Sequence, residues 1–155
     1  MTHISAILNN MIMWASLTAF LVAQVAKILF NFFVERKWDF NLLMSSGSFP
    51  SSHTAIVCAL AVSVGKVEGW DSSLFAISVA LAVIVMYDAA GVRRAAGNQA
   101  KVINYMVDWL KMHQGDRLVF NLEEKRLKEL IGHTPFEVFG GAIVGCIVAI
   151  IFFGI

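Results

Sequence analysis

The stretch Gly47-Ser-Phe-Pro-Ser-Ser-His-Thr-Ala55 separates two hydrophobic runs of the chain and begins the second of them. Pro50 suits the first turn of a helix, and the residues that follow as far as Gly65 include no Asp, Glu, Lys or Arg. A helix N-terminus exposes unpaired N–H groups and the positive end of the helix dipole, so it attracts anions. His53 adds a group that titrates near neutral pH, although a histidine here also fits a simple helix cap or a contact with lipid headgroups. The sequence therefore predicts a polar, anion-attracting corner between two apolar helices.

The composition favours an integral membrane protein. The 155 residues are 58% hydrophobic and 15% charged, and the mean hydropathy is +0.71. Soluble domains carry about 25% charged residues, so this chain lacks the polar material to cover a globule of its size. We predict an all-α fold, a polytopic membrane helical bundle that forms a single domain over residues 1–155.

A helix of about 20 apolar residues crosses the hydrocarbon core of a bilayer. Stretches that approach this length predict about four spans, over residues 11–34, 50–67, 72–92 and 136–155.

The segment 93–135 lies between the third and fourth expected spans. Apolar and charged residues alternate at helical spacing over 95–113, which predicts either an interfacial helix or a continuation of the third span. After a loop over 114–120, a second short amphipathic helix is expected over about 121–132.

The basic residues are concentrated on one side of this topology. With four spans, residues 35–49 and 93–135 share one side and hold ten of the twelve Lys and Arg residues. By the positive-inside rule that side is cytoplasmic. We therefore predict a multi-pass protein of the cell membrane, with the segment 93–135 in the cytoplasm and both termini on the opposite side.

The same topology brings the polar ends of the four spans to the cytoplasmic face. Charged groups near hydrocarbon are costly, so a cluster of them is by default a functional site. Arginines beside a span are also ordinary partners of anionic lipid, and a metal site built from the histidines and carboxylates stays open at this point. The expected cluster consists of Lys27, Asn31, Arg36, Ser51, Ser52, His53, Asp88, Arg93, Arg94, His133 and Glu137.

His133 and Glu137 are four residues apart, so they share one face if their helix begins early enough. A carboxylate that fixes the tautomer of a histidine can make it a nucleophile toward phosphorus, provided that another group protonates the leaving oxygen. Thr134-Pro-Phe-Glu137 is equally a capping box, with Pro135 at the first helical position. The two roles of Glu137 are compatible.

Two further pairs concern packing. Cys58 and Cys146 lie in apolar runs, which indicates reduced, buried thiols rather than a disulfide or a metal site. Gly141 and Gly145 form a Gly-x-x-x-Gly pair, which predicts close packing of the last span either within the bundle or across a dimer.

Three motifs together resemble a known family. FPSSHTA over 49–55, YDAAGVRRAAGNQA over 87–100 and ELIGHTPFEVFGGA over 129–142, in this order between short spans, are similar to the divergent bacterial and plant branch of the type 2 phosphatidic acid phosphatase superfamily. The resemblance extends over nearly the whole chain from Gln24 onward. It implies a membrane-embedded, helical and metal-independent enzyme without a cofactor, which removes phosphate from lipid phosphates or pyrophosphates through a phosphohistidine.

The resemblance also implies residue roles. Lys27 and Arg36 resemble the phosphate-binding pair of the first motif, although their separation is longer and no proline follows. His53 matches the general acid of the second motif, in which Ser52 replaces a glycine. His133 matches the nucleophile of the third motif, and Glu137 stands where that motif has aspartate.

One element of the third motif is missing. No arginine stands at the family spacing before His133; Arg126 is one residue too far and Lys128 is nearer, so Arg93 or Arg94 from the third span is the candidate substitute. These departures bear on activity rather than on fold. The superfamily core usually has six helices, so the shorter chain suggests a reduced bundle or one completed in a homodimer.

The leading hypothesis is thus a membrane-embedded lipid-phosphate or isoprenoid pyrophosphate phosphatase. Its partners would be the bilayer and a lipid phosphate substrate, with no nucleic acid. In this hypothesis His133 attacks phosphorus, Glu137 holds its ring and His53 protonates the leaving oxygen, while the substrate is bound by Lys27, Arg36, Ser51, Ser52, Asp88, Arg93 and Arg94. The alternatives are a non-catalytic protein that binds or translocates an anionic lipid headgroup, and a structural subunit anchored by the same charges.

Overall fold

The computed structural model describes residues 3–36, 38, 48–114, 126–127 and 132–154, and the described residues form helices and no strands. The all-α fold predicted from the sequence is therefore confirmed. In chain order the elements are α1 (His3–Leu8), α2 (Met11–Glu35), α3 (Ser52–Glu68), α4 (Ser73–Tyr87), the π-helical turn η2 (Asp88–Val92), α5 (Arg93–Gln114) and α6 (Pro135–Phe153).

Four of these helices begin at a side-chain cap. The oxygens of Asn10, Ser51, Ser72 and Thr134 each accept a hydrogen bond from the backbone N–H three residues further on. Such a cap satisfies one of the N–H groups that a helix start leaves without an intrahelical partner. The polar residues between the apolar runs therefore determine where α2, α3, α4 and α6 begin.

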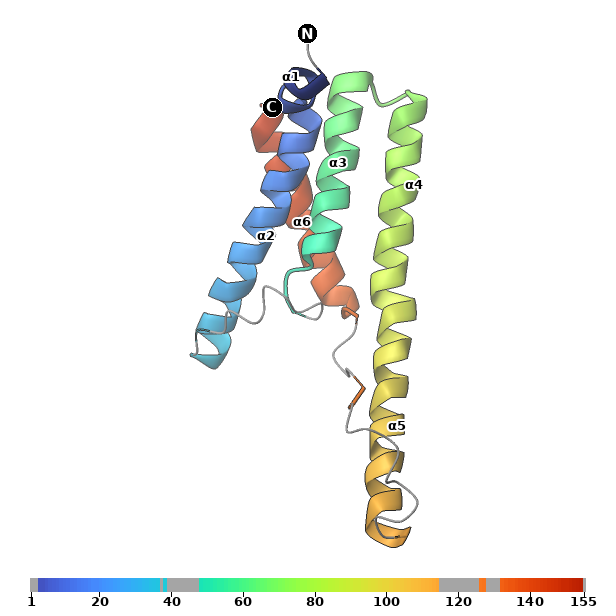
Figure 1. The fold of residues 1–155 in the computed structure, drawn as a ribbon. Coiled ribbons are helices and arrows are strands. Elements are labelled where there is room, and N and C mark those ends of the chain that lie inside the picture. The colour runs from blue at the N-terminus through green and yellow to red at the C-terminus, as the bar shows by residue number, and fades with distance from the viewer. Residues whose placement is uncertain (1–2, 37, 39–47, 115–125, 128–131, 155) are drawn as a thin grey trace.

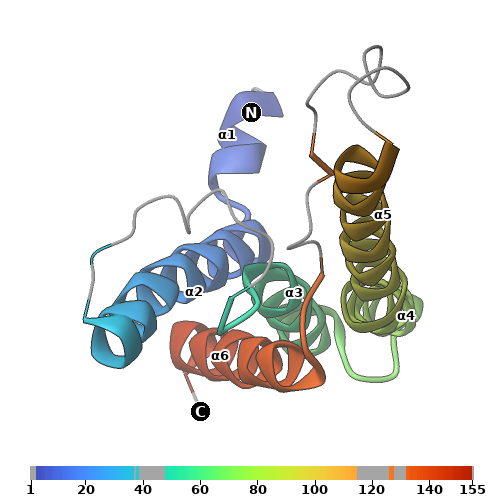
Figure 2. The same ribbon diagram turned by 90° about the horizontal axis from the view of Figure 1, so that it is seen from below.

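Helix α3 lies in the middle of the bundle, in contact with α2, α4 and α6 (Figures 1 and 2). Small residues make the close approach possible. Ala19, Ala59 and Ala149 from three different helices form a common buried cluster. A Cβ added at Gly141 or Gly145 would collide with the backbone of Ser51 or Ala55, respectively. The Gly-x-x-x-Gly pair thus packs α6 against α3 within one chain.

Among the described helices, three are long and apolar enough to cross a membrane: Met11–Glu35, the continuous helix Ser73–Leu110, and Pro135–Phe153. The expected span over 50–67 corresponds to α3, which has only 17 residues. At 1.5 Å per residue α3 is about 26 Å long, slightly less than the hydrocarbon thickness of about 30 Å.

Helix α4, the turn η2 and helix α5 form one long rod that extends well beyond the other helices (Figure 1). The residues over 95–113 therefore continue the helix of the third span in the same direction, which favours the second of the two alternatives left by the sequence. Residues 126 and 127 contact the polar side of α5. The side chain of Asn104 forms hydrogen bonds with the backbone of Leu127, and Arg126 forms an ion pair with Asp108 at 2.7 Å. The expected loop over 114–120 is wrong at Gln114, which is the last residue of α5; residues 115–120 and most of the short helix over 121–132 lie outside the described residues.

Both ends of the chain lie at the same end of the bundle as the turn between α3 and α4 (Figure 1). The starts of α3 and α6, with their histidines, lie at the other end, beside the junction of α4 and α5.

Candidate functional site

A cavity of about 240 Å³ lies at this second end of the bundle. Its walls come from the start of α3, the last turn of α4, the π turn and the residues just before α6. The lining residues are His53, Ile84, Val85, Asp88, Ala89, Arg93 and His133. The structure therefore brings both histidines of the sequence motifs to one cavity, together with one carboxylate and one guanidinium group.

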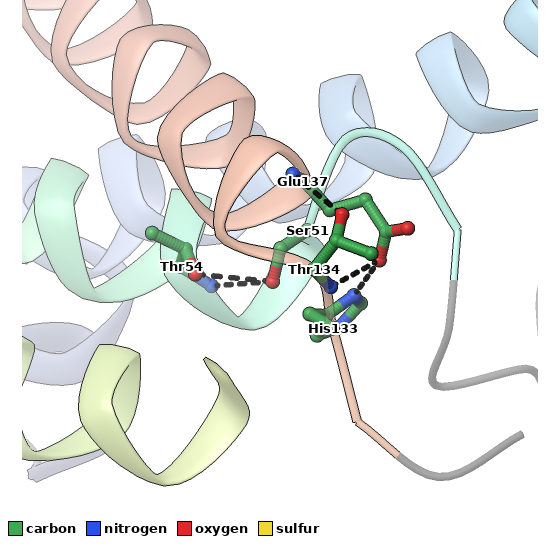
Figure 3. A network of polar contacts seen from close by, with 5 residues as sticks. All are labelled: Ser51, Thr54, His133, Thr134 and Glu137. Carbon is green, nitrogen blue, oxygen red and sulfur yellow. Dashed lines mark hydrogen bonds and ion pairs between the residues drawn. The ribbon is translucent and has the colours of Figure 1, made fainter. Parts of the chain in front are cut away.

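His133 is held on two sides. Its side chain is only 3% exposed, and its Nδ1 lies 2.8 Å from Oε2 of Glu137 (Figure 3). Because an ionised carboxylate can only accept, Nδ1 carries the proton in this contact and Nε2 keeps its lone pair. The backbone N–H of His133 donates to the carbonyl of Ala89 at 2.9 Å. A buried imidazole with a fixed ring and a free Nε2 has the form of a nucleophile or a base.

Glu137 performs the capping role as well. Its Oε2 accepts from the backbone N–H of Thr134 at 3.3 Å, and its own N–H donates to Oγ1 of Thr134 at 3.3 Å (Figure 3). These two bonds form the capping box of α6. The same oxygen therefore begins the helix and orients His133.

His53 stands in the first turn of α3, with an exposed side chain on the cavity wall. The neighbouring Ser51 and Ser52 are buried, and the polar groups of Ser51 bond to other parts of α3 and α6. Oγ of Ser51 accepts from the N–H and the hydroxyl of Thr54, while the N–H of Ser51 donates to the carbonyl of Glu137 at 3.0 Å. The polar groups of Ser51 thus tie α3 to α6, and neither Ser51 nor Ser52 is among the lining residues. Phosphate binding by these two residues stays a prediction.

Asp88 and Arg93 form an ion pair, with Nε 2.6 Å from Oδ2 and both side chains partly exposed. Both line the cavity. Arg94 is exposed and is not among the lining residues, although its backbone is in contact with Gly132. Of the two arginines proposed as substitutes, the structure therefore places Arg93 at the cavity.

The two residues of the first motif have different environments. Lys27 is buried within the bundle, with 1% of its surface exposed, and interacts electrostatically with Glu137 and with both histidines. Arg36 is exposed at the left-handed C-cap of α2. Neither is among the lining residues, so the structure does not bring the phosphate-binding pair of the first motif to the cavity wall.

The pKa of His133 lies below its ordinary value, with burial as the largest cause, while the hydrogen bond and the charge of Glu137 act in the opposite direction. Lys27 and Arg93 lower the pKa of His133 further, because a positive charge disfavours imidazolium. The ring is therefore neutral at pH 7, as a nucleophile requires.

In the part of the chain that the structure describes, no group of three or more His, Cys, Asp or Glu side chains is placed to hold a metal ion. Cys58 and Cys146 are both free thiols; Cys58 is buried as the sequence predicted, whereas Cys146 is only half-buried.

A sequence model described as the Divergent PAP2 family matches residues 8–148 of the chain. The chain belongs to this family. A relative from Bacillus subtilis (strain 168), named Uncharacterized membrane protein YuiD, is 44% identical over 150 residues, which cover 94% of this chain and 95% of the relative. No solved structure matches the chain. The resemblance inferred from the three motifs is thus confirmed, and the protein is a membrane protein of this family with three candidate spans.

Some features of this divergent PAP2 site were not found by sequence reasoning. The carbonyl of Ala89 holds the backbone of His133, and Ile84 and Val85 supply an apolar wall. Every residue has a backbone carbonyl, so the residue type at position 89 does not predict this hydrogen bond. Aliphatic residues are common in an apolar span, so the sequence does not show which of them line a cavity. The motif YDAAGVRRAAGNQA does include Ala89, but its sequence pattern did not indicate a π turn.

Proposed function

We propose that the protein is a membrane-embedded phosphatase that hydrolyses a lipid phosphate or an isoprenoid pyrophosphate through a phosphohistidine. The observation that carries the proposal is the buried imidazole of His133, fixed by Glu137 through Nδ1, on the wall of a cavity that His53 and Arg93 also line. Membership of the divergent PAP2 family supports the same class of reaction.

In the proposed reaction, Nε2 of His133 attacks the phosphorus atom and forms an N–P bond as the bond to the leaving oxygen breaks. His53 gives its proton to that oxygen, so the product leaves as a neutral alcohol or as a monophosphate. A water molecule then attacks the phosphohistidine, His53 takes its proton, and the N–P bond breaks to release inorganic phosphate. Arg93 offsets the charge on the equatorial oxygens in both steps.

A second candidate function is the binding or translocation of an anionic lipid headgroup without chemistry. One observation favours it: of the cations that the family resemblance assigns to phosphate, only Arg93 lines the cavity, whereas Arg36 is exposed at the end of α2. A site with few cations would bind a transition state of phosphoryl transfer less strongly.

We further propose that the cavity faces the cytoplasm. Ten of the twelve Lys and Arg residues lie in segments that the topology assigns to this side, and both ends of the chain lie at the opposite end of the bundle (Figure 1).

The decisive experiment measures phosphate release by the purified protein in micelles that contain a diacyl phosphatidate, a single-chain lipid phosphate or an isoprenoid pyrophosphate. His133→Ala and His53→Ala are compared with His113→Ala, a matched control whose exposed ring stacks on Trp109 of α5. We expect His133→Ala to abolish turnover and His113→Ala to leave it unchanged. Acid-labile phosphate trapped on the wild-type protein but not on His133→Ala would support the phosphohistidine.

Turnover that survives in His133→Ala would contradict the proposed mechanism. Absence of turnover in the wild-type protein, with lipid binding that His133→Ala or Arg93→Ala weakens, would favour the second candidate.

A further inference from the structure

A π-helical turn interrupts the long rod at the wall of the cavity. In η2 the backbone N–H of Arg93 donates to the carbonyl of Asp88, a step of five residues instead of the four of an α-helix. Single π turns within α-helices occur frequently at functional sites. Here α-helix continues on both sides, in α4 and α5, so the turn is a local widening of an otherwise regular rod.

The turn changes which side chains share a face. Asp88 and Arg93 are five residues apart, and in an α-helix of 3.6 residues per turn they would point about 140° apart. In the π turn they are neighbours, with their charged groups 2.6 Å apart, and both line the cavity. The widened turn therefore supplies the ion pair at the cavity wall.

The π turn also contacts the backbone segment that precedes α6. The carbonyl of Ala89 accepts the N–H of His133 at 2.9 Å. A carbonyl within a regular α-helix is already engaged by the N–H four residues on, whereas a π turn shifts this ladder and makes an oxygen accessible to a donor from outside the helix. Glu137 orients the ring of His133 from α6, and Ala89 fixes the backbone of His133 from the π turn.

Gly132 makes this docking possible. Its φ is +102°, a value that side-chain-bearing residues rarely adopt. A Cβ at this position would also collide with the backbone of Arg93 and Arg94, where the π turn passes into α5. Only glycine satisfies both conditions at once.

We propose that the π turn Asp88–Val92 is the element that positions His133 for phosphoryl transfer, and that Gly132 is the positioning residue through which the His133 backbone docks on it. The catalytic part of this inference rests on the proposed function. The docking part does not, since the contacts of Ala89 and Gly132 exist whatever reaction the site performs.

The first test compares Gly132→Ala with Gly154→Ala. Gly154 is a matched control because it also has a positive φ, of +69°, but a Cβ there would meet nothing within 4 Å. We expect Gly132→Ala to lower kcat by at least about tenfold, with a smaller change in KM, because a misplaced imidazole of His133 affects the transition state more than substrate binding. Gly154→Ala should leave both constants unchanged.

A second readout is independent of turnover. An NMR titration of ¹⁵N-histidine-labelled protein follows the ring of His133, whose pKa is lowered mainly by burial. If Gly132→Ala displaces His133 from its buried position, this pKa rises toward its ordinary value, whereas Gly154→Ala leaves it unchanged. This result would support the docking even for a protein without phosphatase activity.

A second pair of variants covers the case in which Gly132→Ala does not fold. Deletion of Ala90 shortens the π turn by one residue, and deletion of Met112 removes one residue from the same rod near the end of α5. We expect the Ala90 deletion to reproduce the loss of kcat and the rise in the pKa of His133, and the Met112 deletion to change neither. Unchanged kcat and unchanged titration of His133 in folded Gly132→Ala, or in the Ala90 deletion, would overturn the proposal.

Discussion

At the scale of single residues, one carboxylate links the fold to the chemistry. Oε2 of Glu137 accepts from the backbone of Thr134 as part of the capping box and from Nδ1 of His133. The start of α6 and the orientation of the imidazole are therefore set by the same atom. A glutamate at this position fills both roles because its side chain reaches back over the first turn of its own helix.

The first prediction concerns pH. Burial lowers the pKa of His133, so the neutral, nucleophilic ring persists as the pH falls through 6.5, and the acidic limb of kcat/KM due to this residue should lie below pH 6.5. Glu137→Gln removes the charge that raises this pKa, so the limb should move to still lower pH. The same change weakens the fixed tautomer and should lower kcat by about 100-fold or more.

To check this prediction, phosphate release is measured between about pH 4 and 9, a range that brackets the ordinary pKa of histidine. A limb that moves to higher pH in Glu137→Gln would contradict the assigned influence of the carboxylate.

The second prediction separates two arginines that the sequence treated alike. Arg93 lines the cavity, so Arg93→Ala should lower kcat/KM by about 100- to 1,000-fold, the usual effect of losing one charged donor to the transition state. Arg36 is exposed at the end of α2, so Arg36→Ala should change kcat/KM by about twofold or less. Steady-state kinetics on both variants provides the measurement, and equal losses would show that Arg36 contributes directly to the site.

The sequence was informative about which side chains meet at the cavity and uninformative about how deeply each is buried. The spacing of His133 and Glu137 and the motif around His53 led to the cavity without coordinates. The burial of Lys27 and the engagement of Ser51 with α6 depend on which helix faces touch, and in a chain so rich in apolar residues that information is not in the periodicity. Only the packed structure shows which helix faces are in contact.

At the scale of elements, α3 and α6 form the frame that carries both histidines. Their close approach depends on glycines that face the backbone of the other helix, with Gly145 against Ala55. In a bilayer the hydrophobic effect does not drive helices together, so van der Waals contact at small residues is the main source of such association.

The third prediction tests this contact. Gly145→Leu forces α6 away from α3 and should destabilise the bundle by about 1–3 kcal/mol, the usual cost of overpacking. Ile147→Leu on the same helix is the control, because Ile147 is half exposed and the change conserves volume. Thermal unfolding in micelles, followed by far-UV circular dichroism, gives the comparison. Unchanged stability with loss of a dimer would instead assign the glycine pair to an interface between two chains.

Helix starts were predictable at this scale, whereas the π turn was not. The Thr134 capping box has a local sequence signature that does not depend on the rest of the fold, and it is confirmed. The expected place of Pro50 in the first turn of α3 is wrong, because Ser51 is the N-cap and Pro50 precedes it. The π turn over Asp88–Val92 depends on what it contacts, including the backbone around Gly132. These contacts join residues about 40 positions apart, so the local sequence around Asp88–Val92 does not predict them.

At the scale of the whole molecule, the long rod of α4, η2 and α5 fixes where the cavity stands relative to the bilayer. The apolar part of the rod over 73–92 is about 30 Å long, which matches the hydrocarbon thickness. The cavity lies where this part ends, so under the proposed function a lipid phosphate bound there would keep its apolar chain beside the apolar part of the rod. Its position relative to the two leaflets then decides which lipid pool it can reach.

The fourth prediction concerns that leaflet. In a Cys58→Ala, Cys146→Ala background, Asp71→Cys lies in the turn between α3 and α4, and Asn98→Cys lies on α5 beyond the cavity; both native side chains are exposed. The concentration of Lys and Arg near α5 predicts that a membrane-impermeant maleimide labels Asp71→Cys in intact cells, and Asn98→Cys only after the membrane is permeabilised. Labelling of both after permeabilisation is the control for accessibility. The reverse pattern in intact cells would place the cavity on the outer leaflet and would restrict its substrates to lipids that reach that leaflet.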